Sequence, residues 1–185
     1  MEPNNPDPKV LNIPIRLIGG IFFVCLAGFC LTVAGLITDS WYVYYYAGRV
    51  RIQEGMWKRY FLGVERDQTD AVTVTARAFV IMGILFGVVC CILLIIFMDS
   101  RKTKMVRMLS AMSSFLAGIL ILIGVFIFDT YFNPDYSYSF FLALFGGLFY
   151  LVTGILVLVD MRLTNYSRIP NKCSQSQEIV HIAFT

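Results

Sequence analysis

The sequence predicts an all-α membrane protein, a bundle of four transmembrane helices that carries a small antiparallel β-sheet outside the bilayer. Three observations predict it. Of the 185 residues, 58% are hydrophobic, and the mean hydropathy is +0.72, above the level of an ordinary soluble domain. Four uncharged apolar runs approach the length of about 20 helical residues that crosses the hydrocarbon. Between the first two runs, polar and apolar side chains alternate with the period of a β-strand, most clearly at residues 49–53.

The four runs divide the chain into three parts. We expect a polar N-terminus at residues 1–16, a four-span domain at 17–160 and a polar cytoplasmic tail at 161–185. A soluble helical core of this size would show polar faces at helical spacing, and the runs show none. The predicted spans are Leu17–Ile37, Ala78–Met98, Leu109–Phe128 and Phe140–Val159, joined on the exterior by loops 38–77 and 129–139.

Prolines and basic residues predict the state of the N-terminus and the orientation of the spans. Four prolines predict that residues 1–14 are disordered and hold no helix, and the long first run indicates a signal anchor. Residues 99–107 include four basic side chains, whereas 129–139 include none. Basic residues stay on the cytoplasmic side in short loops, so we expect both termini in the cytoplasm, at the plasma membrane. The five basic residues of the first loop before Arg77 argue the other way.

Small residues recur on one face of every predicted span. Close backbone approach is how helices pack in lipid, so these faces are candidate helix contacts. They are typical of an intramolecular four-helix bundle, and a dimer face on one of them is the alternative. The candidate packing residues are Gly28, Gly35, Gly83, Gly87, Gly118, Ala143 and Gly147.

The residues that enzymes and pumps require do not occur in the predicted spans. The chain has one histidine, His181 in the tail, and no carboxylate pair at membrane depth. No spacing of metal ligands or phosphate-binding glycines is present either. We therefore expect a protein that is not an enzyme, uses no cofactor and binds no nucleic acid. None of the five cysteines lies in an exterior loop, which excludes an exterior disulfide within the chain, and Cys173 is either lipidated or a free thiol.

The first exterior loop is the main candidate for recognition. Its aromatic residues, which begin with Trp41, are typical of an interfacial belt. Their alternation with basic residues favours a small sheet instead. Arg77, just before the second span, requires an acidic or carbonyl partner at the boundary, unless it extends to lipid headgroups. We expect Trp41 and Trp57 to hold the sheet on the ends of the first two spans, with burial of Trp57 in the place of a disulfide.

Four motifs in order resemble the PMP22/EMP/MP20/claudin superfamily, which includes the calcium-channel γ subunits. They are Thr38-Asp39-Ser40-Trp41, Gly55-Met56-Trp57, the stretch from Ala76 to Met82 that contains Arg77-Ala78, and the Tyr-Ser stretch that ends at Phe140. The resemblance implies four spans, with Trp41, Gly55, Trp57 and Arg77 as its signature. The superfamily's Leu is Met56 here, and the two cysteines that follow its Gly-Leu-Trp motif are absent. We therefore expect a reduced sheet of about three strands from Trp41–Leu62, with Thr130–Asn133 as a source of a fourth.

Two classes of function follow. The first is a structural or adhesive membrane protein that organises cell junctions or lateral assemblies, in contact with the lipid bilayer and with other membrane proteins. The second is an accessory subunit that regulates a channel or receptor. In the tail, Ile182 and Phe184 approximate the pattern by which protein phosphatase 1 docks its partners, although so short a pattern also arises by chance.

Overall fold

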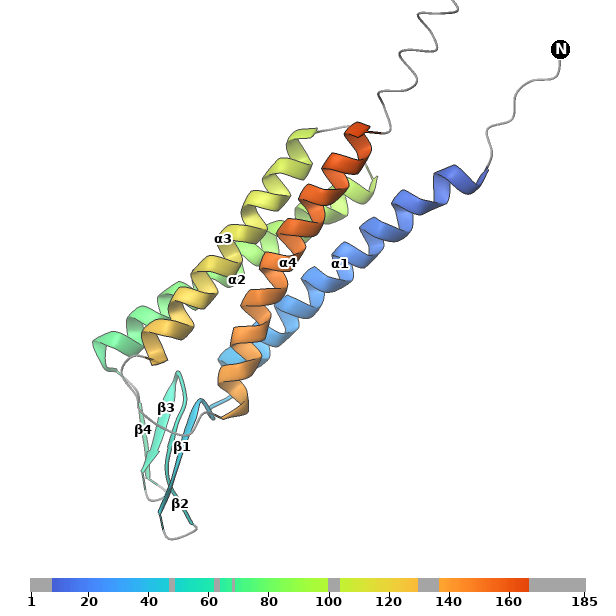
Figure 1. The fold of residues 1–185 in the computed structure, drawn as a ribbon. Coiled ribbons are helices and arrows are strands. Elements are labelled where there is room, and N and C mark those ends of the chain that lie inside the picture. The colour runs from blue at the N-terminus through green and yellow to red at the C-terminus, as the bar shows by residue number, and fades with distance from the viewer. Residues whose placement is uncertain are drawn as a thin grey trace, which may run out of the picture.

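Four long helices form a bundle, and a small sheet lies at one end of it (Figure 1). The computed structural model describes residues 8–46, 49–61, 64–67, 69–99, 104–129 and 137–166. Each helix contains a stretch long and apolar enough to cross a membrane. The helices are α1 (Pro8–Ile37), α2 (Ala71–Asp99), α3 (Lys104–Asp129) and α4 (Tyr138–Tyr166). The predicted fold class, a four-helix membrane bundle with a small antiparallel sheet, is confirmed.

All four helices begin before the predicted spans, and α1 and α2 do so by the largest margins. Helix α1 begins at Pro8, so the expectation that residues 1–14 hold no helix is wrong for 8–14. Proline is accepted in the first turn because the amide hydrogen that it lacks has no partner there anyway. Helix α2 begins at Ala71, where the backbone carbonyl of Asp70 accepts from the Val74 amide at 3.0 Å. The polar residues of this first turn hide the helix from a search for apolar runs.

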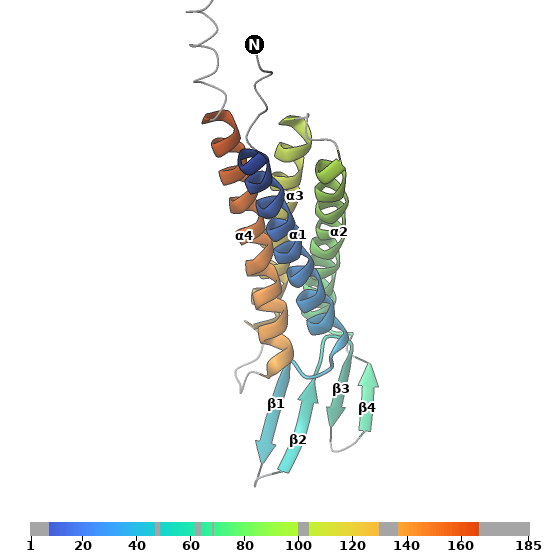
Figure 2. The same cartoon turned by 90° about the vertical axis from the view of Figure 1, so that its right-hand side faces the viewer.

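The helices pack in two pairs that meet along one side. Helix α1 packs on α4 and α2 packs on α3, and the α3–α4 contact joins the pairs (Figures 1 and 2). The contact between α1 and α2 is sparser. The sheet lies at the ends of the helices near Ile37 and Ala71, and the beginning of α1 and the end of α4 lie at the opposite end, which we call the far end.

The predicted packing residues lie where one helix meets another within the chain. A side chain on Gly35 would come within 2.7 Å of the backbone nitrogen of Ala143 in α4, and Gly28 lies against the same helix. Gly83 faces Ile121 in α3. Gly118 and Gly147 lie at the α3–α4 contact, and Gly87 lies under the hydroxyl of Tyr150. These positions serve the intramolecular bundle.

The sheet has four antiparallel strands in the order β1-β2-β3-β4 (Figure 2). They are β1 (Tyr42–Tyr46), β2 (Arg49–Glu54), β3 (Lys58–Phe61) and β4 (Val64–Asp67). We expected three strands before residue 62, but the same loop supplies a fourth. This fourth strand, β4, has one apolar residue and is exposed along its whole length, so its sequence shows no alternation of apolar and polar residues. The other candidate, Thr130–Asn133, lies outside the described residues.

Candidate functional site: the sheet and its attachment to the bundle

Trp41 attaches the start of the sheet to the ends of three helices. The chain bends back after α1, and the indole Nε1 donates to the carbonyl oxygen of Gly35 at 2.8 Å. The ring meets Phe128 of α3 and Phe140 of α4 edge to face, with centroids 5.0 and 6.1 Å apart. Trp41 is completely buried. A fully buried tryptophan with its N–H satisfied is a strong attachment point for a short loop domain.

Tyr42 extends this attachment and was not among the residues that the sequence singled out. Its ring stacks on Phe128 with centroids 5.4 Å apart and planes within 3° of parallel. The hydroxyl donates to Oδ1 of Asp129 at 3.2 Å, and the residue is completely buried. The sequence could not separate Tyr42 from its neighbours, because Tyr42, Tyr44, Tyr45 and Tyr46 all fit an interfacial belt. We call Trp41, Tyr42, Phe128 and Phe140 the aromatic anchor.

The turn between β2 and β3 sits directly on the end of α1. The Gly55 amide donates to the carbonyl of Lys58 at 2.9 Å, which closes the turn. A side chain at Gly55 would come within 2.5 Å of the Cα atom of Asp39, so only glycine allows this approach. Met56 is fully buried beneath the turn. Residues Gly55 and Met56 of the Gly55-Met56-Trp57 motif thus form a turn that packs directly against the end of α1.

Trp57 and Arg77 clamp the same turn from outside. The Trp57 indole donates to the carbonyl oxygen of Leu36 at 2.8 Å. The guanidinium carbon of Arg77 lies 4.9 Å from the centre of the Trp57 ring, and its Nε donates to the carbonyl oxygen of Met56. Arg77 therefore has the carbonyl partner that its position at the boundary called for.

The four signature residues come together at one end of the bundle. Trp41 and Gly55 are buried, but Trp57 is 39% exposed. The expectation that burial of Trp57 replaces a disulfide is therefore wrong, because Trp41 and Met56 supply the buried contact. Trp57 acts instead through its hydrogen bond and through the cation above its ring.

A buried carboxylate lies at the junction of β2 and β3. Glu54 is 5% exposed, and its Oε1 lies 2.6 Å from Nε of Arg59. Nη2 of the same arginine lies 3.6 Å from Oδ2 of Asp70. Burial raises the pKa of Glu54 above its ordinary value of 4.5, and the positive charge of Arg59 opposes part of that rise. The other oxygen, Oε2, is buried without a hydrogen-bond partner among the described residues. The environment of Glu54 therefore stabilises its charged form less well than water does.

An apolar row crosses one face of the sheet. Register pairs Tyr44 with Ile52, Ile52 with Phe61, and Phe61 with Val64. These four residues, which we call the apolar row, share a face with Tyr42 and Glu54 because residues two apart on a strand point the same way. Phe61 is 49% exposed and Val64 58% exposed. Half of the row is therefore accessible to a partner.

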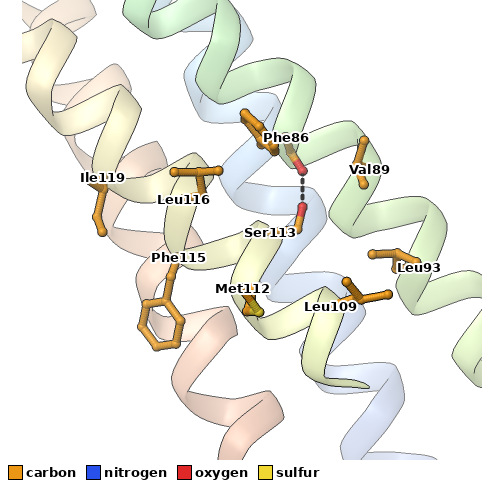
Figure 3. Close-up of a pocket in the computed structure, with 9 residues that line it drawn as sticks. All are labelled: Phe86, Val89, Leu93, Leu109, Met112, Ser113, Phe115, Leu116 and Ile119. Carbon is orange, nitrogen blue, oxygen red and sulfur yellow. Dashed lines mark hydrogen bonds between the residues drawn. The ribbon is translucent and has the colours of Figure 1, made fainter. Parts of the chain in front are cut away.

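A second apolar surface lies on the bundle, between α2 and α3 (Figure 3). It is a groove of about 680 Å³. Among the described residues that line it, Ser113 alone has a polar side chain, and its hydroxyl donates to the carbonyl oxygen of Phe86 at 2.7 Å. The groove residues are Phe86, Val89, Leu93, Leu109, Met112, Ser113, Phe115, Leu116 and Ile119.

The far end holds a buried ion pair that the sequence analysis missed. Nη1 of Arg107 lies 3.3 Å from Oδ2 of Asp160 and donates to Oγ1 of Thr164 at 2.9 Å. The guanidinium also lies over the ring of Phe97 at 4.4 Å. Asp160 is 4% exposed. A carboxylate at a span end gives no sign in the sequence of whether water or a cation meets it.

The tail positions Ile182, Phe184 and Cys173 lie outside the described residues, so their proposed roles stay predictions. No protein-family model matches the chain, and the comparison with curated proteins finds no match. The fold defines a class, a multi-span membrane protein with four apolar helices and a small antiparallel sheet at one end. The resemblance to the claudin superfamily rests on the four motifs.

Proposed function

We propose that this chain is a non-enzymatic structural or adhesive membrane protein that organises membrane contacts, and that it is a relative of the claudins without their exterior cysteine pair. In this proposal the sheet lies outside the cell, both termini lie in the cytoplasm and the protein resides in the plasma membrane. The partner is another membrane protein, either a second copy or a different chain.

The observation that carries the proposal is the combination of a firm attachment with an accessible apolar surface. The aromatic anchor holds the first strand, and the Trp57–Arg77 contact holds the turn before the third strand. The apolar row crosses the same sheet and is exposed at Phe61 and Val64. A surface that is already ordered loses less conformational entropy when a partner binds, so attachment favours recognition.

The orientation rests on charge and on the position of the helix ends. The sequence between α2 and α3 contains Arg101 and Lys102, and Lys104 and Arg107 follow in the first turn of α3. The end of α2, the beginning of α3 and the beginning of α1 lie at the far end, away from the sheet (Figure 1). Basic residues of short loops favour the cytoplasmic side, so the sheet end is assigned to the exterior.

Vesicle clustering tests the proposal. Purified full-length protein is inserted into phospholipid vesicles, and clustering is followed by light scattering. The variant with Phe61→Ser and Val64→Ser should lose clustering, because both changes remove apolar surface from the exposed end of the row. Glu65→Ser changes a neighbouring side chain on the opposite face of the same strand and should retain it. The adhesive role is rejected if wild-type vesicles do not cluster, or if both variants cluster like the wild type.

The second candidate is an accessory subunit of a channel or receptor, and the groove between α2 and α3 favours it. A partner helix in the membrane would fit along this face. However, helices in lipid approach closely through small residues. Ser113 is the one small residue of the groove, and it already bonds to Phe86. We therefore place this candidate second. The order would be reversed if a channel co-purified with the protein from native membranes and no longer co-purified with the Leu116→Trp variant.

A further inference from the structure

Three thiols from two helices meet inside the bundle. The Sγ atom of Cys25 in α1 lies 3.4 Å from Sγ of Cys91 and 3.8 Å from Sγ of Cys90, both in α2. Cys25 and Cys90 are completely buried, and Cys91 is partly exposed. Cys30, one and a half turns further along α1, is exposed on the outside of the bundle. Its environment therefore differs from that of the other three.

The other two helices contribute polar groups to the same region. The Cys90 thiol donates to the carbonyl oxygen of Ser110 in α3 at 3.6 Å. Tyr150 of α4 reaches across the bundle, and its hydroxyl lies against Gly87, one turn before Cys91 on α2. That hydroxyl is buried and has no hydrogen-bond partner among the described residues. The three thiols therefore lie in a region of the bundle interior that also holds polar groups from α3 and α4.

We propose that Cys25 and Cys91 form an oxidation site that closes to a disulfide between α1 and α2. A disulfide has an S–S length of about 2.05 Å. Sulfur atoms already in contact at 3.4 Å approach this length by small rotations of the two side chains. Cys91 is the partner because it is nearer to Cys25 than Cys90 is, and because the Cys90 thiol already bonds to Ser110.

The oxidant in this proposal is hydrogen peroxide, which is small enough to enter between the helices. Two S–H bonds break and one S–S bond forms. Two electrons pass to the peroxide, its O–O bond breaks, and the two thiol protons complete two molecules of water. This site is independent of the proposed adhesive role.

The position of the bond determines its effect. Helix α1 packs along α4 and α2 packs along α3, while the contact between α1 and α2 is sparse. A covalent bond from Cys25 to Cys91 closes this weaker contact. It also joins the two helices between which the whole sheet is attached. Oxidation therefore converts two helix pairs joined along one side into a bundle closed on both sides.

Thiol counting tests the proposal on the full chain in phospholipid vesicles. Reduced protein is exposed to hydrogen peroxide, unfolded in detergent and labelled with a maleimide mass tag. The chain has five cysteines, so reduced protein should take five tags, and oxidised protein should take three after two thiols are lost. Mass spectrometry of the unreduced digest should then identify a peptide that joins Cys25 to Cys91. Cys30→Ser should leave that peptide unchanged, and Cys91→Ser should abolish it.

Three results would overturn the proposal. The first is five tags after peroxide treatment. The second is a wild-type cross-link from Cys25 to Cys90, which would assign the wrong partner. The third is a cross-link through Cys30 between copies, with Cys25 and Cys91 still reduced. Because the wild type supplies the main readout, a variant that fails to fold does not prevent the test.

Discussion

Replacement of Trp41 by alanine should release the sheet from the bundle while the four spans remain inserted. Trp41 is completely buried, and its indole satisfies the Gly35 carbonyl. Loss of a buried tryptophan costs about 3–5 kcal/mol. Trp57→Ala is the matched control, because this indole also donates to a helix carbonyl but its ring is 39% exposed. Its loss removes a hydrogen bond and a cation–π contact, together about 2 kcal/mol.

Limited trypsin digestion measures this difference, since trypsin cuts after basic residues and the sheet contains Arg49, Arg51, Lys58, Arg59 and Arg66. When the protein opens and closes faster than it is cut, the digestion rate follows the population of the open form. Each factor of ten corresponds to about 1.4 kcal/mol, so Trp41→Ala should accelerate cleavage about a thousandfold and Trp57→Ala about thirtyfold, up to the rate of a fully open loop. Cleavage of Trp41→Ala no faster than that of Trp57→Ala would show that burial of Trp41 does not hold the sheet on the bundle.

Two further predictions concern the bundle and the pH dependence of the sheet. Gly87→Leu should prevent folding and surface delivery because its side chain would collide with the Tyr150 hydroxyl, whereas Val88→Leu on the outer face should be tolerated; equal delivery of both variants contradicts this role. Burial raises the pKa of Glu54 against the opposing charge of Arg59, so the folded sheet binds its proton more tightly than the unfolded chain does. The stability from this group should be complete below about pH 4.5 and be lost as the pH rises through the folded pKa, and Glu54→Gln should remove the dependence. Urea unfolding followed by tryptophan fluorescence measures the free energy of unfolding at each pH. The prediction is contradicted if the stability of the wild type increases with pH in this window, or if Glu54→Gln shows the same pH dependence as the wild type.

The helices were predictable because hydrocarbon imposes one strong rule on any segment that crosses it. Long uncharged runs satisfy this rule, and all four became helices. Their ends were less predictable. Helix α2 begins seven residues before Ala78. The predicted span missed these residues because Arg77 interrupts the apolar run and Thr73 and Thr75 are polar.

The sheet was predictable where its strands alternate and unpredictable where they do not. Strand β2 shows the alternation in sequence, and β4 reads Val-Glu-Arg-Asp with every side chain exposed. Backbone pairing with β3 makes β4 a strand, and that pairing leaves no sequence pattern.

The candidate site was partly predictable for a similar reason. Tryptophans and an arginine at a span boundary are rare enough to attract attention individually. The roles of Tyr42, Phe128 and Phe140 depend on three chain segments meeting. The pairing of Arg107 with Asp160 depends on α3 meeting α4. Contacts of this kind are set by tertiary structure, and their residues look ordinary in the sequence.

We infer that the sheet is an ordered platform held by buried aromatic contacts rather than by a covalent bridge of its own. Amide hydrogen exchange of the full chain in lipid nanodiscs, with and without a reducing agent, tests this inference. The paired amides of β2 and β3 lie in the middle of the sheet and should exchange slowly and equally under both conditions. Fast exchange throughout residues 42–67, or protection that disappears on reduction, would contradict this inference.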